Sequence, residues 1–155
     1  MSNLSALHST FVIERAFSVP PSKVFRAWAS ADVKKAWMKC DDAMITEEMT
    51  LDFRPGGQET NRVMAPDGTV HRFEGYYLDI VENARIIYAF NMYLSEKRIS
   101  TSLATVEFQP SATGSKMVFT EQIVFLDGYE DRQDRIRGTE IGLDNLVAYL
   151  RVGGH

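Results

Sequence analysis

The sequence predicts an α+β domain, in which a curved, seven-stranded antiparallel sheet carries two short helices after its first strand and a long C-terminal helix packed across it. Three observations predict this fold class. Residues 131–151 carry apolar side chains at helical spacing, most of the chain before them has the composition of β-strands, and the connections between those strands are short. Short connections make consecutive strands antiparallel neighbours. Because the strands follow one another without intervening helices, a βαβ arrangement is not expected.

The first strand is expected at residues 10–18, which are rich in β-branched and aromatic side chains. Two prolines follow and end the strand. Proline is tolerated in the first turn of a helix, so residues 21–29 are expected to form a short helix with its apolar side chains inward. Ser30 suits the N-cap of a second short helix that runs to Trp37.

Six further strands are expected, each bounded by residues that favour chain reversal. They are residues 43–53, 58–64, 69–80, 85–93, 99–109 and 116–126. The turn Arg54-Pro55-Gly56-Gly57 has the pattern of type II, because glycine at the third position adopts a positive φ without steric cost. Ala65-Pro66-Asp67-Gly68 is expected to turn by the same logic. Gly75 in the middle of a strand predicts close approach of another backbone, such as that of the last helix, or a bend in the sheet.

The last element is expected to be an amphipathic helix over residues 131–151. Its apolar face consists of residues three and four positions apart: Ile136, Thr139, Leu143, Leu146, Val147 and Leu150. Its other sides are expected to carry the polar residues Arg132, Arg135, Arg137, Glu140 and Asp144. The acidic stretch before the helix, and Arg151 and Gly153 at its end, suit the two termini. Such a helix is not stable alone in water, so it is expected to lie on the sheet.

Composition indicates one domain and excludes several kinds of partner. With 155 residues, of which 45% are hydrophobic and 25% charged, the chain is expected to fold as a single domain over residues 10–152, with short tails at 1–9 and 153–155. The formal net charge of −4 argues against nucleic acid and anionic membranes. No apolar run approaches the ~20 residues that cross a bilayer. The single cysteine, Cys40, excludes an internal disulfide and, with no secretory signal visible, indicates a cytoplasmic protein.

Several motifs carry a resemblance to a known family: Pro20-Pro21-Ser22-Lys23-Val24-Phe25-Arg26-Ala27-Trp28, Trp37, Asp52-Phe53-Arg54-Pro55-Gly56-Gly57, Pro66-Asp67-Gly68, Phe73-Glu74-Gly75-Tyr76-Tyr77-Leu78-Asp79-Ile80 and Thr120-Glu121-Gln122. With the element order, they resemble the helix-grip fold of the START/birch-pollen-allergen (SRPBCC) superfamily. The resemblance is closest to the domain named for the activator of the heat-shock protein 90 ATPase, in its small stand-alone bacterial-type form. It covers about residues 10–150 and implies a cavity between the sheet and the long helix. Many members have Gly-Trp near the start of that helix, whereas here Gly138 precedes Thr139, so the chain resembles a separate branch.

Glu121 is the most informative single residue on the expected inner face. It shares one face of its strand with Met117, Phe119, Ile123 and Phe125. A carboxylate on an apolar face must be paired, protonated or solvated inside a pocket. Glu121 is therefore a candidate general base. The alternatives are an ion pair with an arginine, a solvated rim, or a bulge that shifts the register.

His71 begins the strand 69–80, in register with Phe73, Gly75 and Tyr77. It is a candidate to share a proton with Glu121 as a general acid/base pair, the alternative being a solvated strand end. No spacing of histidine, cysteine or carboxylate residues resembles a metal site, so neither a metal nor another cofactor is expected.

A larger set of aromatic and apolar residues is expected to line the ligand pocket, although any one of them could instead fill a closed core. They are Trp28, Trp37, Phe53, Phe73, Tyr77, Tyr88, Phe90, Met92, Phe108, Phe119, Leu143 and Leu146.

Three functions are compatible with these residues and with the resemblance. The first is a small-molecule binding protein whose apolar or aromatic ligand is fixed by Glu121 and by His71 or Tyr88. The second is an enzyme of the cyclase or hydrolase type that uses Glu121 as general base. The third, ranked last, is a chaperone-interacting module with an exposed patch in place of a cavity. Homodimerisation is left open by the sequence.

Overall fold

The computed structural model describes residues 4–38 and 43–151 and confirms the predicted order of elements. Cys40 lies outside the described residues, as does Gly153. In chain order the elements are β1 (Ala6–Phe17), α1 (Pro21–Ala29), α2 (Ala31–Trp37), β2 (Ile45–Leu51), β3 (Gln58–Met64), β4 (Val70–Val81), β5 (Arg85–Leu94), β6 (Lys97–Ser111), β7 (Gly114–Leu126) and α3 (Arg132–Arg151).

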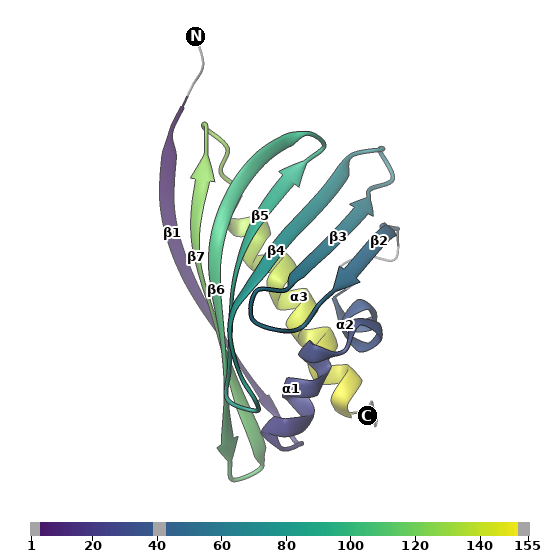
Figure 1. Ribbon diagram of the computed structural model, residues 1–155, viewed down its shortest axis with the longest axis vertical. Helices are drawn as coiled ribbons and strands as arrows, with labels where there is room; N and C mark the ends of the chain where they lie inside the picture. The colour runs from purple at the N-terminus through teal and green to yellow at the C-terminus, as the bar shows by residue number, and fades with distance from the viewer. Residues whose placement is uncertain (1–3, 39–42, 152–155) are drawn as a thin grey trace.

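The seven strands form one antiparallel sheet in the order β1-β7-β6-β5-β4-β3-β2. Each strand from β2 to β7 pairs with its neighbour in sequence, and only β1 joins the sheet at a distance, beside β7. The sheet curves around α3, which crosses its inner face diagonally, while α1 and α2 lie near the end of α3 (Figure 1). The predicted α+β fold class, a long helix gripped by a curved sheet, is confirmed.

Local differences from the prediction have simple physical causes. β1 begins at Ala6, so residues 6–9 are part of the strand and not a tail, because they pair in register with β7 from Leu126 to Ile123. Gly56 has a φ of 84°, as a type II turn requires at its third position. In the second turn the positive φ of 87° falls instead on Gly68, the fourth residue. There the Asp67 carboxylate accepts a hydrogen bond of 2.9 Å from the Thr69 backbone.

The core lies between the inner face of the sheet and the apolar face of α3. Alternate residues of β7 from Met117 to Phe125 are buried there. From the helix, Leu143, Leu146 and Leu150 are buried, which confirms the predicted apolar face. Burying a leucine side chain contributes about 1.5–3 kcal/mol, so this face holds α3 on the sheet. Among the helices of the described chain, none has the length and apolar character needed to cross a membrane.

Candidate functional site

A buried ion pair joins α2 to β3 inside the molecule. The Lys34 ammonium lies 2.6 Å from Oε1 of Glu59, and the two side chains are only 1% and 2% exposed. The Tyr77 hydroxyl donates a hydrogen bond to the same Glu59 oxygen and accepts one of 3.2 Å from the Lys34 Nζ. Burial, and then the neighbouring Glu59 carboxylate, raise the pKa of Tyr77, so its hydroxyl stays protonated. Lys34, Glu59 and Tyr77 therefore form one buried, hydrogen-bonded cluster.

The local sequence explains how a lysine comes to be buried. Ser30 caps α2, and Lys34 follows one turn later, on the same side as Trp37. The Trp37 indole donates a 2.9 Å hydrogen bond to the Ala27 carbonyl, which holds α2 against α1. As a result, the Lys34 Nζ lies 5.1 Å from the centre of the Trp28 ring. A cation over an aromatic face is attracted by the ring quadrupole, and more strongly when both are removed from water.

A second buried ion pair joins β7 to α3. Nη1 of Arg135 donates a 2.9 Å hydrogen bond to Oε2 of Glu121, and the Ser102 hydroxyl donates another of 2.9 Å to the same oxygen. Nη2 of Arg135 donates to the Ser100 hydroxyl at 2.7 Å. The Arg135 side chain is 9% exposed and that of Glu121 is 2% exposed. The pair therefore ties the first turns of the long helix to the middle of the sheet.

Tyr88 lies between the two ion pairs. In the register of the sheet, Glu121 is opposite Ala104, Ala104 is opposite Tyr88, and Tyr88 is opposite Tyr77. Burial raises the pKa of Tyr88 well above 10, and the Glu59 and Glu121 carboxylates raise it further. The phenol is therefore neutral. Tyr88 is 8% exposed, and its hydroxyl is not one of the fully buried polar atoms that lack a partner in the described chain.

Two buried polar atoms near Lys34 lack a hydrogen-bond partner among the described residues. They are Oε2 of Glu59 and Nε1 of Trp28. A buried polar atom without a partner costs free energy, and more so when the group is charged. Most such atoms in folded proteins are satisfied by protein or by ordered water. The interior around Lys34 therefore holds hydrogen-bonding capacity that the protein itself does not use.

An aromatic ring covers the middle of β4 beside this cluster. A Cβ placed on Gly75 would lie 2.7 Å from Cε1 of Phe73, so the glycine makes room for that ring. The Phe73 ring stacks on Phe90 with 4.8 Å between centroids and lies 6.4 Å from the Tyr88 ring. The close neighbour of Gly75 is thus a side chain of its own strand, and the predicted approach of the backbone of the long helix is wrong.

Comparison with known proteins decides the family. The model of the Activator of Hsp90 ATPase homolog 1-like protein family matches residues 18–151, which is most of the chain. The chain belongs to this family. Among curated proteins, none matches it.

Several solved protein structures share the fold of this chain. An uncharacterized protein from Rhizobium leguminosarum is 53% identical, with 96% of this chain and 97% of that chain covered and a TM-score of 0.91. A protein from Rhizobium loti is 36% identical, with 93% and 98% covered and a TM-score of 0.86. An AHSA1-like protein from Aeromonas hydrophila, 18% identical with 94% of each chain covered and a TM-score of 0.68, shares the fold alone.

In this family member, the two predicted catalytic residues lie apart. Glu121 is buried on the inner face as expected, and it takes one of the predicted alternatives, an ion pair with an arginine. His71 lies next to the β3–β4 turn, in register with Val63 and Leu94. Tyr77, on the same strand as His71, is the residue that lies level with Glu121 across the sheet. His71 is six residues from Tyr77 along β4, which is about 20 Å at ~3.3 Å per residue. The structure does not bring His71 and Glu121 together.

His71 influences the Asp67 carboxylate in the neighbouring β3–β4 turn. Hydrogen bonds from Thr69 lower the pKa of Asp67, and the nearby His71 lowers it further. This position corresponds to the alternative predicted for His71, the end of a strand beside a turn.

The predicted lining residues all belong to the core of this family member or pack directly against it. Nine are buried: Trp28, Trp37, Tyr77, Tyr88, Phe90, Phe108, Phe119, Leu143 and Leu146. Phe53, Phe73 and Met92 are partly buried against them. Their rings contact one another in series, for example Phe53 on Tyr77 at 5.1 Å between centroids and Tyr77 on Tyr88 at 5.8 Å. Their role in binding a ligand stays a prediction.

The predicted polar position of Arg135 is wrong, and the Lys34–Glu59 pair was missed. Arg135 directly precedes Ile136 on the helix, at the border of the apolar face, and its long side chain reaches inward to Glu121. Lys34 reads as one of two adjacent lysines on a short helix, which usually face solvent. The only signal was its position three residues before Trp37, which places both on one side of the helix. The residues next to Lys34 and Glu59 in the sequence do not show that the two side chains form an ion pair.

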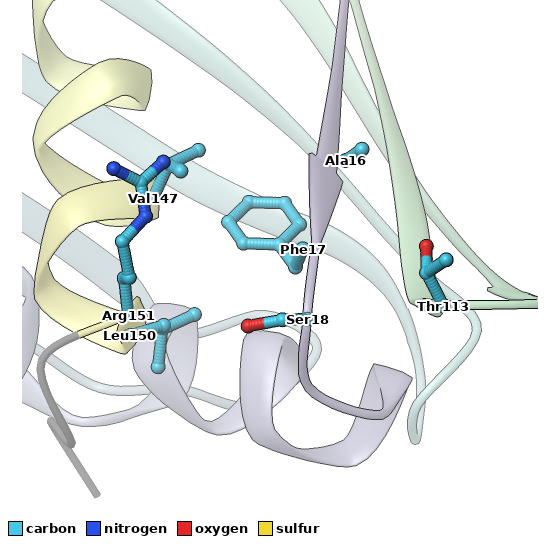
Figure 2. Close-up of a pocket in the computed structure, with 7 residues that line it drawn as sticks. All are labelled: Ala16, Phe17, Ser18, Thr113, Val147, Leu150 and Arg151. Atoms are coloured by element: carbon cyan, nitrogen blue, oxygen red, sulfur yellow. The ribbon is translucent and has the colours of Figure 1, made fainter.

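Two hollows lie at the rim of the molecule, away from both ion pairs. The first, of about 240 Å³, is bounded by the end of β1, by Thr113 and by the last turn of α3 (Figure 2). Its lining residues are Ala16, Phe17, Ser18, Thr113, Val147, Leu150 and Arg151. The second, of about 520 Å³, lies between α1, α2 and the end of α3. In the described part of the chain, no cluster of three or more histidine, cysteine or carboxylate residues is arranged to hold a metal ion.

The pKa of Glu121 is raised from 4.5 because burial disfavours its charged form, while Arg135 and Ser102 oppose the shift by stabilising the carboxylate. Replacing Ser102 with alanine is therefore expected to raise the pKa of Glu121 further. The shift is measurable by NMR titration of the ¹³C-labelled Glu121 carboxyl. Ser115→Ala is the control, because the Ser115 hydroxyl is also buried but bonds the Val19 carbonyl. An equal titration of Glu121 in wild type and S102A would contradict the role assigned to Ser102.

Proposed function

We propose that this protein binds a small apolar or aromatic molecule between the sheet and α3. The supporting observation is the aromatic interior that contains two buried hydrogen-bonding atoms without partners among the described residues, Oε2 of Glu59 and Nε1 of Trp28. A region built only for stability would leave fewer such atoms, since each one costs free energy. Ligand sites commonly combine apolar walls with a few polar groups that fix orientation.

The surrounding residues are suited to recognition more than to proton transfer. Glu121, the candidate base of the enzyme alternative, has one carboxylate oxygen held by both Arg135 and Ser102. Both donors hold that oxygen in a buried ion pair, although burial raises the pKa of Glu121 overall. The Lys34–Glu59 pair is similarly bonded to Tyr77. We therefore propose binding, and no chemical step.

The two tryptophans offer a direct report of binding. Trp28 and Trp37 are the only tryptophans in the chain, and their ring centroids lie 4.9 Å apart in the core. A molecule that enters this interior is expected to change their emission, which makes intrinsic fluorescence a titration signal for ligands that do not absorb in the same range.

Native mass spectrometry of freshly purified protein is expected to show a species heavier than the chain, whose extra mass is lost on denaturation. The identity of that mass would define the ligand. The same protein, after denaturation, extraction and refolding, serves as the ligand-free control. A bare chain mass, together with unchanged tryptophan emission across a panel of apolar and aromatic compounds, would contradict the proposal. The alternative indicated by the family's description, an interaction with a chaperone of the Hsp90 type, would then be the function to test.

A further inference from the structure

We propose that the ligand is a neutral, flat aromatic molecule with a hydroxyl group, whose ring takes the place of the Phe73 ring over Gly75 and whose hydroxyl bonds Glu59 and Tyr88. This inference rests on the proposed function and names the chemical class of its ligand. We call the space over Gly75, which the Phe73 ring now fills, the ring slot.

The ring slot has the shape and walls of an aromatic site. Gly75 forms its floor, since a Cβ there would lie 2.7 and 2.9 Å from two atoms of the Phe73 ring. In register across the sheet, Glu59 lies on one side of Gly75 and Phe90 on the other. Phe90 stacks on the ring in the slot at 4.8 Å and an interplanar angle of 28°. Stacked aromatic rings gain free energy beyond their buried area.

The Phe73 side chain can move its ring out of the ring slot. Phe73 is only partly buried, whereas Phe90 and Tyr88 beside it are buried. Its contact with Gly75 involves the far end of the side chain, Cε1 and Cζ. Rotation about the side-chain bonds of Phe73 therefore empties the slot without moving the strand. A ligand ring that replaces it keeps the stacking on Phe90.

The polar groups beside the slot select a hydrogen-bond donor. Glu59 uses Oε1 for Lys34 and Tyr77, while Oε2 is buried without a partner among the described residues. A carboxylate oxygen only accepts hydrogen bonds, so its ligand partner must donate. The Tyr88 hydroxyl both donates and accepts. A ligand hydroxyl placed between them donates to Glu59 and accepts from Tyr88, which gives Oε2 of Glu59 the partner that it lacks among the described residues.

Charge balance excludes an anionic ligand. The interior holds the cations Lys34 and Arg135, and each is already paired with a carboxylate, Glu59 and Glu121. The four groups sum to zero net charge. A carboxylate ligand would add an unpaired negative charge beside Glu59, and a buried unpaired charge is strongly unfavourable. A neutral phenol adds none.

Three naphthalene probes that differ in one group test this class by isothermal titration calorimetry at neutral pH. 2-Naphthol is expected to bind about tenfold or more tightly than 2-methoxynaphthalene, which cannot donate, because a hydrogen bond to a charged group is the stronger kind. 2-Naphthoate, an anion, is expected not to bind. Equal affinity for all three probes would overturn the inference and leave the proposed function standing. If none of the three binds to wild type or to F73A, the inference is overturned and the proposed function loses its support.

Substitutions test each wall of the slot separately. Tyr88→Phe is expected to lose about tenfold in affinity for 2-naphthol with no change for 2-methoxynaphthalene, since only the hydroxyl is removed. Tyr129→Phe is the matched control, since the Tyr129 hydroxyl bonds Asp131 outside the slot. Similar losses in Y88F and Y129F would overturn the role of Tyr88.

Changing the volume of the slot tests its location. Phe73→Ala empties the slot and is expected to strengthen binding of both 2-naphthol and 2-methoxynaphthalene, by about tenfold, because the ligand then displaces no side chain. Gly75→Ala places a methyl group on its floor and is expected to weaken both by about tenfold. Gly142→Ala is the control, since a Cβ there meets nothing within 4 Å. Binding that is unchanged in both F73A and G75A would show that the ligand lies elsewhere and overturn the inference.

Discussion

Replacing Lys34 with methionine is expected to lower the free energy of unfolding by about 3–5 kcal/mol. The Glu59 carboxylate, 2% exposed, would lose its cation and, within the described part of the chain, keep the Tyr77 hydroxyl as its one side-chain donor. Moving a carboxylate from water into the protein costs several kcal/mol, and in the wild type the ammonium 2.6 Å away offsets that cost. Urea denaturation at neutral pH, followed by tryptophan fluorescence and circular dichroism, measures the loss.

Two further variants separate the burial of charge from other causes. Arg85→Met breaks the ion pair with Asp79, which has the same 2.6 Å length but lies at the surface with side chains 47% and 38% exposed. Its expected cost is at most about 1 kcal/mol. The double variant Lys34→Met with Glu59→Leu removes both charges and is expected to recover most of the loss. If K34M and R85M cost the same, the account of a buried, water-excluded pair is wrong.

Replacing Arg135 with methionine is the second change with a large expected effect, again about 3–5 kcal/mol in the free energy of unfolding. Arg135 holds one oxygen of Glu121 and the hydroxyl of Ser100, both buried. Without the guanidinium, Glu121 keeps the hydrogen bond from Ser102 as its one side-chain donor among the described residues. Burial already raises the pKa of Glu121, and loss of Arg135, which lowers it, would raise that pKa further. The same denaturation assay measures the change in stability.

The same helix supplies the control for Arg135. Arg137, two residues further along, is exposed, so Arg137→Met removes an equal charge and side-chain length without uncovering a buried carboxylate. Its expected effect is within about 0.5 kcal/mol. The double variant Arg135→Met with Glu121→Leu should again recover most of the loss. Equal stability of R135M and R137M would mean that the contact with Glu121 contributes nothing measurable.

The elements of this fold were predictable because their signals are local. Helix α1 begins and ends at the residues predicted for it, since Pro21 in the first turn is a strong start signal. Gly56 makes its turn with the positive φ that its position predicts. The apolar face of α3 follows from a repeat of three and four residues. The inward position of Glu121 follows from strand alternation, because a period of two leaves only two faces to choose from.

The polar interior was not predictable, because its partners are distant in sequence. Lys34 and Glu59 are 25 residues apart, and Lys34 and Tyr77 are 43 apart. Nothing in the residues around Lys34 shows that α2 turns it toward β3. Arg135 was expected on the polar side of its helix because periodicity treats an arginine as a surface residue, whereas its long side chain reaches back into the core.

By itself, the sequence determined the α+β class, the order of the elements and the inward face of β7, because periodicity and turn chemistry act between residues close along the chain. The family followed from the resemblance of its motifs, and the family model over residues 18–151 shows it. Only the tertiary structure decided which charges are paired, that His71 lies far from Glu121, and that a phenylalanine fills the space over Gly75. These features depend on how the strands stack in register and where the helices cross them. Burial gives these features their effect on stability, because an unpaired charge or hydrogen-bonding atom costs little free energy in water and much more in the core.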